Sequence, residues 1–182
     1  MEQEFRSEIK IAPADERTIL KAIELSQRTK MEVRDKKVLS LGIHYPISKG
    51  EMKHILVAVD KNGEVVGALK AERVSEDDFD WFEVGEESEP IEISKVCVDE
   101  KFRGKHIASE MLECVKRLFP NSNLYADVLQ KPIENTASEK AFFRSGFEKI
   151  KQKRWFHKDF NATFVWGIFR FFVKNNKKLT TD

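Results

Sequence analysis

The chain has 182 residues, of which 41% are hydrophobic and 35% are charged, and its formal net charge is +1. This length and composition predict one domain with a substantial core over residues 1–174, followed by a polar tail over residues 175–182. The near-neutral charge argues against binding through bulk charge, so no nucleic-acid partner is expected.

Signals for export, a membrane or a metal are missing from the sequence. Residues 1–5 lack the basic and then apolar pattern of a signal peptide. The longest apolar stretch, residues 162–173, is interrupted by Arg170 and is shorter than the roughly 20 residues of a membrane span. Cys97 and Cys114 form neither a metal-ligand spacing nor a disulfide framework. These features predict a cytoplasmic protein that binds no metal.

The N-terminal half begins with a predicted strand and two predicted helices. The strand covers residues 9–11 and is ended by Pro13. Apolar residues at helical spacing follow Asp15 and predict a helix to about Ser26. A second helix is expected within residues 32–41.

A β-hairpin follows, and then an acidic stretch. Asn-Gly within residues 60–63 joins two β-rich runs, over residues 54–59 and 64–74, and both turn residues tolerate positive φ. Residues 75–94 then hold nine acidic residues and no Lys, Arg or His, with Phe79, Trp81 and Phe82 among them. One interpretation is a solvated acidic hairpin or loop. The other is an acidic rim with aromatic walls that attracts a cationic substrate.

The centre of the chain predicts a strand, a basic turn and an amphipathic helix. The strand covers residues 91–98, and the helix has apolar residues at a 3.6-residue period until Pro120 ends it. The turn over residues 101–106 contains three cations besides His106 and one glycine. Because the first turn of a helix presents unpaired N–H groups, this is a candidate seat for a phosphate. A solvated connection is the alternative.

The C-terminal part predicts four more elements. A strand is predicted over residues 124–129, and a helix over residues 135–146 ends at Gly146. Two strands follow over residues 147–153 and 163–173, and residues 155–161 join them. The last strand has apolar residues on both faces, so it is covered on both, either by the chain itself or by a second subunit. Monomer and homodimer both remain open.

Two segments resemble the GNAT family of acyl-CoA N-acyltransferases. The first is the family's motif Arg/Gln-x-x-Gly-x-Gly/Ala at a helix start, which residues 103–108 match at Arg103 and Ala108, with His106 where the family usually has glycine. The second is an asparagine followed after seven residues by an aromatic residue and then by Gly-Phe, which corresponds to Asn135, Phe142 and residues 146–147. The resemblance implies an α/β fold with a mixed sheet of six to seven strands and about four helices. The strands over residues 91–98 and 124–129 would be parallel and splay apart to admit the acyl chain.

The resemblance also implies acetyl-CoA as co-substrate and a primary amine as acceptor, either a small cation or a protein lysine or N-terminus. The pyrophosphate would lie on residues 104–108, beside the cations Arg103 and Lys105. The side chain of His106 would either shift the pyrophosphate or add a hydrogen-bond donor to it. The strand edge over residues 96–98 would bind the pantetheine arm, with the N–H of Val98 polarising the thioester carbonyl.

Further site residues at Gly104, Val96, Ala108 and Asn135 follow from the same resemblance. Gly104 and Ala108 would contribute backbone amides, and Val96 would contribute its strand edge. Asn135 would bond the pantetheine arm, although a helix-capping role alone would also explain it.

Glu92 is the candidate general base. It lies eleven residues before Arg103, the offset at which the histone-acetyltransferase branch of the family carries its catalytic glutamate. Burial near the cofactor would raise its pKa and suit it to this role. As the last acidic residue of the acidic stretch, Glu92 could instead be a surface charge. His44 and Glu89 are the reserve candidates for the general base.

The general acid is not carried over from the family. Many members have a tyrosine where this chain has Phe142, which has no proton to give. Tyr125, Tyr45, Cys97 or water could replace it. The departures at His106 and Phe142 motivate an alternative function, a catalytically silent acyl-CoA-binding sensor or regulatory module. A pure scaffold that binds no coenzyme A is a third hypothesis.

Overall fold

The computed structural model describes residues 9–28, 31–33, 37–39, 52, 54–85 and 89–173. The sequence predictions at His44, at Tyr45 and in the tail after residue 173 fall outside these ranges. None of the helices in the described ranges is long and apolar enough to cross a membrane.

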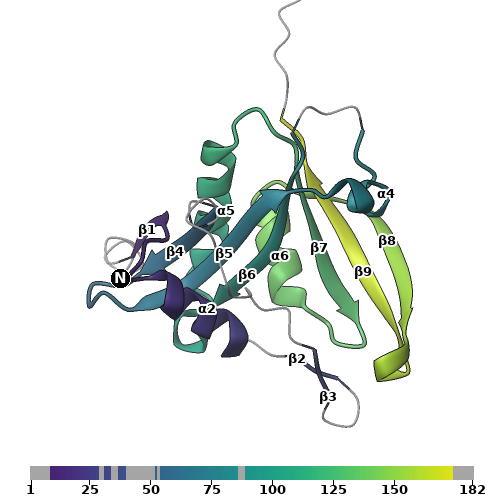
Figure 1. The fold of residues 1–182 in the computed structure, drawn as a ribbon, viewed down its shortest axis with the longest axis horizontal. Coiled ribbons are helices and arrows are strands. Elements are labelled where there is room, and N and C mark those ends of the chain that lie inside the picture. The colour runs from purple at the N-terminus through teal and green to yellow at the C-terminus, as the bar shows by residue number, and fades with distance from the viewer. Residues whose placement is uncertain are drawn as a thin grey trace, which may run out of the picture.

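A seven-stranded mixed sheet forms the centre of the molecule (Figure 1). Its strands, in spatial order, are β1 (Lys10–Pro13), β4 (Ile55–Val59), β5 (Val65–Arg73), β6 (Ile91–Val98), β7 (Leu124–Lys131), β9 (Ala162–Phe171) and β8 (Glu148–His157). All neighbours are antiparallel except β6 and β7, which are parallel. The α/β fold class and the number of strands predicted from the sequence are therefore confirmed.

Helices cover both faces of this sheet. In the described ranges the α-helices are α2 (Ile19–Arg28), α4 (Phe79–Phe82), α5 (Ile107–Leu118) and α6 (Thr136–Arg144), and short 3₁₀ turns are η2 (Glu76–Asp78), η3 (Glu100–Phe102) and η4 (Lys158–Phe160). α5 and α6 bury their apolar residues in the main core cluster on one face. α2 and α4 pack against the other face at opposite ends of the sheet, in two separate clusters (Figure 1).

The close packing of α5 on the sheet follows from its sequence. Met111, Leu112 and Val115 lie at helical spacing and are completely buried, as the predicted amphipathic pattern requires. Below them on β5 stands Gly67, where an added Cβ would lie 3.1 Å from the Met111 Sδ atom and 3.1 Å from the Cβ of Ala58. Glycine at this position therefore lets the helix approach the strand backbone.

The second predicted helix, within residues 32–41, is wrong. The structure instead has two short strands, β2 (Met31–Val33) and β3 (Lys37–Leu39), that pair with each other in antiparallel register. The physical reason lies in the residue types, because Met-Glu-Val alternates apolar and polar at a period of two and β-branched valines favour extended backbone.

Two further segments differ from the sequence prediction. Residues 76–82 of the acidic stretch form a helical turn, η2 followed by α4, where a hairpin or loop was one expectation. Residues 155–157, expected in a connection, extend β8 to ten residues. β9 lies between β7 and β8, and its Phe164, Ile168 and Phe169 are completely buried, so the chain's own elements cover both faces of this strand.

Candidate active site

The sheet opens between β6 and β7. The two strands pair only over Ile91 and Glu92 of β6. Immediately beyond, the register of β6 with β5 shifts and leaves Ser94 as an extra residue. Such a bulge bends its strand and increases the local twist. Figure 1 shows the two strands diverging from this point, with α6 visible between them.

A cavity of about 620 Å³ occupies this opening. Its lining is mostly apolar and includes all three tryptophans of the chain, Trp81 from α4, Trp155 from β8 and Trp166 from β9. This volume is in the range of small-molecule pockets, which combine an apolar lining with a few polar groups.

Carboxylates provide polar groups on one side of the cavity. Along β6 and β7 the neighbours of Glu92 and Asp127 belong to the core cluster that α5 and α6 cover. Since side chains alternate along a strand, both carboxylates point to the opposite face, the face of α4. Asn135, Ser138 and Phe142 of the α6 region line the same cavity from the other face. The cavity thus reaches both faces of the sheet through the opening.

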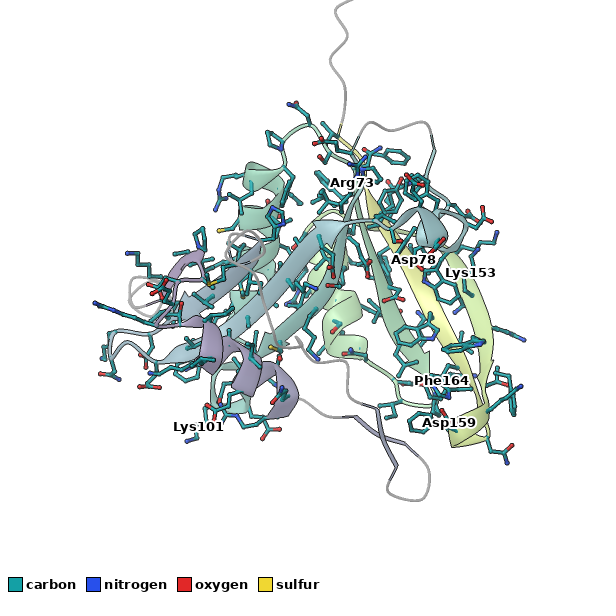
Figure 2. The ribbon with its side chains drawn as sticks, in the orientation of Figure 1. Arg73, Asp78, Lys101, Lys153, Asp159 and Phe164 are labelled. Carbon is teal, nitrogen blue, oxygen red and sulfur yellow. The ribbon has the colours of Figure 1, made fainter. Side chains whose placement is uncertain are left out.

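The segment η2–α4 holds one wall of the cavity in place. The Trp81 Nε1–H donates to Oδ2 of Asp127 at 3.1 Å. At the outer side, Lys153 Nζ donates to the carbonyl of Asp80 at 2.8 Å, and Lys151 forms an ion pair with Glu83. Figure 2 shows Asp78 in this segment and Lys153 approaching it from β8. These contacts anchor the segment η2–α4 beside the cavity.

Burial shifts the pKa of both carboxylates upward. Desolvation, with added repulsion from Asp127, Glu72 and Asp78 and opposed by Lys70, raises the pKa of Glu92 to about 7. Desolvation also raises the pKa of Asp127 to about 6, although the hydrogen bond from Trp81 opposes it. A carboxylate that titrates near neutral pH is suited to accept and return a proton.

Lys95 is the single basic residue among the described lining residues. It lies beyond the bulge, next to Val96. Burial lowers the pKa of Lys95, since a desolvated ammonium is less stable than the neutral amine. On β6 the bulge at Ser94 thus lies between Glu92 and this basic residue, while Asp127 lies on β7.

The edge of β6 beyond the bulge has no partner strand in the opening. The N–H of Asp99 donates to the carbonyl of Val66 on β5. Because successive residues of a strand point their N–H groups to opposite edges, the N–H groups of Val96 and Val98 are directed toward the opening. Val96 lines the cavity, and the carbonyl of Val98 accepts from Nε of Arg103 at 3.3 Å.

The predicted basic turn lies where β6 ends and α5 begins. Residues 103–106 are exposed. Gly104 has φ +78° and His106 has φ +63°. The left-handed backbone of His106 explains why glycine suits this position, because a Cβ is strained there. α5 starts at the next residue, so its first N–H groups lie beside Arg103 and Lys105.

On α6, the two residues of the second motif have structural roles. The Oδ1 atom of Asn135 accepts from the N–H of Ser138 at 3.3 Å and caps the helix, while Asn135 also lines the cavity. Phe142 is buried with its ring centroid 5.0 Å from that of Phe147 and 5.7 Å from that of Phe169. Its place is in the core at the cavity wall.

Tyr125 and Cys97, the two suggested replacements for a general acid that the structure describes, do not line the cavity. Tyr125 is completely buried and packs against Phe82. Cys97 is buried in the α2 cluster and its Sγ atom lies 3.5 Å from the carbonyl of Ala68. Glu89, a reserve for the base, is exposed and does not line the cavity. Within the described residues, no group of three or more His, Cys, Asp or Glu is arranged to hold a metal ion.

The sequence reasoning overlooked several lining residues. Asp127 is the most important, and it had a visible signal as the one charged residue in the apolar run Leu124–Leu129. Trp155 and Trp166 were placed in a connection and in a strand without a role. Their meeting at one cavity depends on the pairing of β8 with β9, where Trp155 is opposite Phe164, which sequence alone does not reveal.

The comparisons with known proteins agree with this architecture. The profile of the acetyltransferase (GNAT) family matches residues 20–147. The chain therefore belongs to the GNAT family, as the two motifs implied, and it is an acetyltransferase. No curated protein matched it by sequence.

Solved structures share the fold at low sequence identity. The chain resembles NAA60 of Arabidopsis thaliana in complex with acetyl-CoA, with a TM-score of 0.63, 15% identity and coverage of 90% of this chain and 99% of that one. It resembles yncA of Salmonella typhimurium, solved with its cofactor acetyl-CoA, with a TM-score of 0.64, 15% identity and coverage of 93% and 96%. The chain also resembles an N-acetyltransferase from Staphylococcus aureus Mu50, with a TM-score of 0.63, 16% identity and coverage of 91% of this chain and 99% of that one.

Proposed function

We propose that this protein transfers the acetyl group of acetyl-CoA to a primary amine and that Glu92 accepts the proton of that amine. The observation that carries the proposal is the position of Glu92 at the closed end of the β6–β7 opening, in a cavity that reaches both faces of the sheet. Its pKa of about 7 suits a base that works at neutral pH.

The remaining roles follow from the edge of β6 and the turn after it. The pyrophosphate binds at the exposed amides of residues 104–108, beside Arg103 and Lys105. The pantetheine arm enters the opening along the unpaired edge at Val96, near Asn135. The N–H of Val96, which lines the cavity with Glu92, donates to the thioester oxygen and stabilises the negative charge that develops there. Val98, the residue expected in this role, lies six residues beyond Glu92 on β6 and outside the cavity lining, which is too far for both groups to act on one thioester.

The transfer replaces the C–S bond of the thioester by the C–N bond of an amide. The neutral amine nitrogen attacks the thioester carbon, the C–N bond forms, and the C–S bond breaks. Glu92 takes the proton from the amine, directly or through a water. The departing thiolate takes a proton from water, since Phe142 has none to give and coenzyme A thiolate is a fair leaving group. Glu92 returns its proton to the solvent, which replaces the one that water gave up. The products are the amide and free coenzyme A.

Replacing Glu92 tests this assignment. Glu92→Gln keeps the shape of the side chain and removes the base, so thiol release from acetyl-CoA should fall by about a hundredfold or more. Calorimetric titration should show that the variant still binds acetyl-CoA. Glu89→Gln is the matched control, because Glu89 is exposed and outside the cavity. Equal rates for both variants would refute the role of Glu92.

A catalytically silent acyl-CoA-binding module is the second candidate. It is favoured by one observation: among the residues that line the cavity in the described part, no tyrosine or cysteine offers a proton to the thiolate. Tight binding of acetyl-CoA with no thiol release over a broad panel of amines would support the module and contradict the transferase.

A further inference from the structure

The cavity holds a second carboxylate that the transfer step does not use. Asp127 is half-buried in the wall of the cavity, and its Oδ2 atom accepts from Trp81. In the described part of the chain no ion pair joins Asp127 or Glu92 to a basic residue. A buried carboxylate without a cation is costly, and a second one nearby increases the cost.

The surroundings of Asp127 suit an organic cation. Trp81, Trp155 and Trp166 line the cavity, and Phe82 completes the aromatic wall. Aromatic faces attract ammonium groups and cover the apolar part of an alkylamine. Beside the two half-buried carboxylates, Asp78 adds a third acidic group, and Lys95 alone opposes them among the described lining residues.

The size of the cavity favours a small acceptor. A cavity of about 620 Å³ that must also admit the acetyl end of the cofactor leaves room for a short alkyl chain. The hydrogen bond from Trp81 fixes the Asp127 carboxylate, so its position relative to Glu92 is set before a ligand binds.

We propose that the acceptor is a short aliphatic diamine, with one amine delivered to Glu92 for acetylation and the other, as an ammonium, bound by Asp127 between the tryptophans. This inference rests on the proposed function and adds the substrate class. Asp127 is then a specificity-determining residue that contacts the substrate at the end away from the reacting nitrogen. The chemistry at the thioester is unchanged.

Matched amines test the proposal. With acetyl-CoA at saturation, kcat/KM is compared for putrescine and cadaverine against butylamine and pentylamine, which have the same carbon chains and one amine fewer. An ion pair with Asp127 in this cavity should favour the diamines by about tenfold or more. Asp127→Asn keeps an acceptor for Trp81 and should collapse the diamine-to-monoamine ratio toward about one.

The control and the contrary outcomes separate this inference from the proposed function. Asp77→Asn removes the same charge from η2 at an exposed position that does not line the cavity, and the ratio should stay as in the native protein. Turnover with no preference for diamines, or a preference that survives Asp127→Asn, would overturn the diamine site while the transferase stands. Faster turnover of a lysine-containing peptide than of any diamine would also overturn it.

A binding measurement covers the case without turnover. All three tryptophans line the cavity, so the intrinsic fluorescence of the coenzyme A complex reports an amine that enters it. Putrescine should change this fluorescence with a Kd about tenfold or more below that of butylamine, and Asp127→Asn should remove the difference. Equal affinities would overturn the proposal even if no amine is acetylated.

Discussion

At the scale of single residues, the site keeps two carboxyl groups where their charged forms are unfavourable. The pKa of Asp127 is raised from 3.8 to about 6 by burial. Below about pH 4 both the folded and the unfolded protein hold this proton, so there is no effect on stability. Between these values the unfolded protein loses the proton first, and stability falls as the pH rises. Above about pH 6 the full penalty remains.

Asp127→Asn should therefore make the protein more stable in the range where Asp127 is ionised. We expect a higher Tm than native at about pH 8, because the asparagine is neutral and still accepts from Trp81, and little difference at about pH 4. Thermal unfolding followed by circular dichroism at both pH values measures this. If the variant is less stable than the native protein at about pH 8, a cation must stabilise the charged form of Asp127, which contradicts this account.

His106 makes a separate prediction about backbone strain. Its φ of +63° is unfavourable for a residue with a Cβ and worst for a β-branched one. His106→Val should lower the free energy of unfolding by about 1–2 kcal/mol, whereas His106→Gly should leave it unchanged or raise it by up to about 1 kcal/mol. Urea unfolding compares the three proteins. An equal loss in both variants would mean that contacts of the imidazole, and not its backbone, matter for stability.

At the scale of elements, the four-residue helix α4 depends on its contacts with the strands below it. Phe82 is buried among Val74, Tyr125 and Ile168, and Trp81 bonds Asp127. A helix this short has no independent stability, so its position is set by packing and by these polar contacts.

Trp81→Phe isolates the polar contact. The ring remains but the N–H is lost, so the pKa of Asp127 should rise further because the bond from Trp81 opposes the effect of burial. Loss of a buried hydrogen bond should cost about 1–3 kcal/mol of stability, and KM for the amine should increase. Phe79→Leu, a change in the same helix at a half-buried residue outside the cavity lining, is the control. Unchanged stability and KM would show that α4 is held by packing alone.

The elements also show how far sequence reasoning reaches. The hairpin β4–β5 and the unit from β6 to α5 were predicted because their signals are local, an Asn-Gly turn and a 3.6-residue apolar period. The pair β2–β3, the length of β8 and the turn of α4 were not, because tertiary pairing and packing decide them. For the same reason the sequence singled out Glu92, by its distance along the chain from Arg103. The position of Asp127 in the cavity depends instead on which face of the sheet its side chain points to, and this follows only from the packing of β7.

At the scale of the whole molecule, the opening between β6 and β7 connects the two faces of the sheet. The turn with Arg103 lies at the end of β6 where α5 begins, and α4 with its acidic and aromatic residues lies on the opposite face. We propose that the cofactor enters from the side of α5 and α6 and the amine from the side of α4. The two substrates then meet at Glu92 without crossing each other.

Charge at the turn should control only the affinity for the cofactor. Arg103→Gln should weaken the binding of acetyl-CoA by about tenfold, because it removes a cation beside the proposed pyrophosphate seat. The binding of a pantetheine analogue that lacks the phosphates should change little. Lys158→Gln, in η4 at the far end of β8, is the control for a lost surface charge. Calorimetric titration measures the affinities, and equal loss for both ligands would place the phosphates elsewhere.

The most direct measurement is the rate of a single acetyl transfer as a function of pH, for the native protein and for Glu92→Gln. The native rate should rise with an apparent pKa near 7, the value for Glu92 with Asp127, Glu72 and Asp78 around it and Lys70 opposing them. In Glu92→Gln this step in the profile should disappear and the rate at its plateau should fall by about a hundredfold or more. A variant that keeps the native profile and the native rate would contradict the central claim that Glu92 is the base.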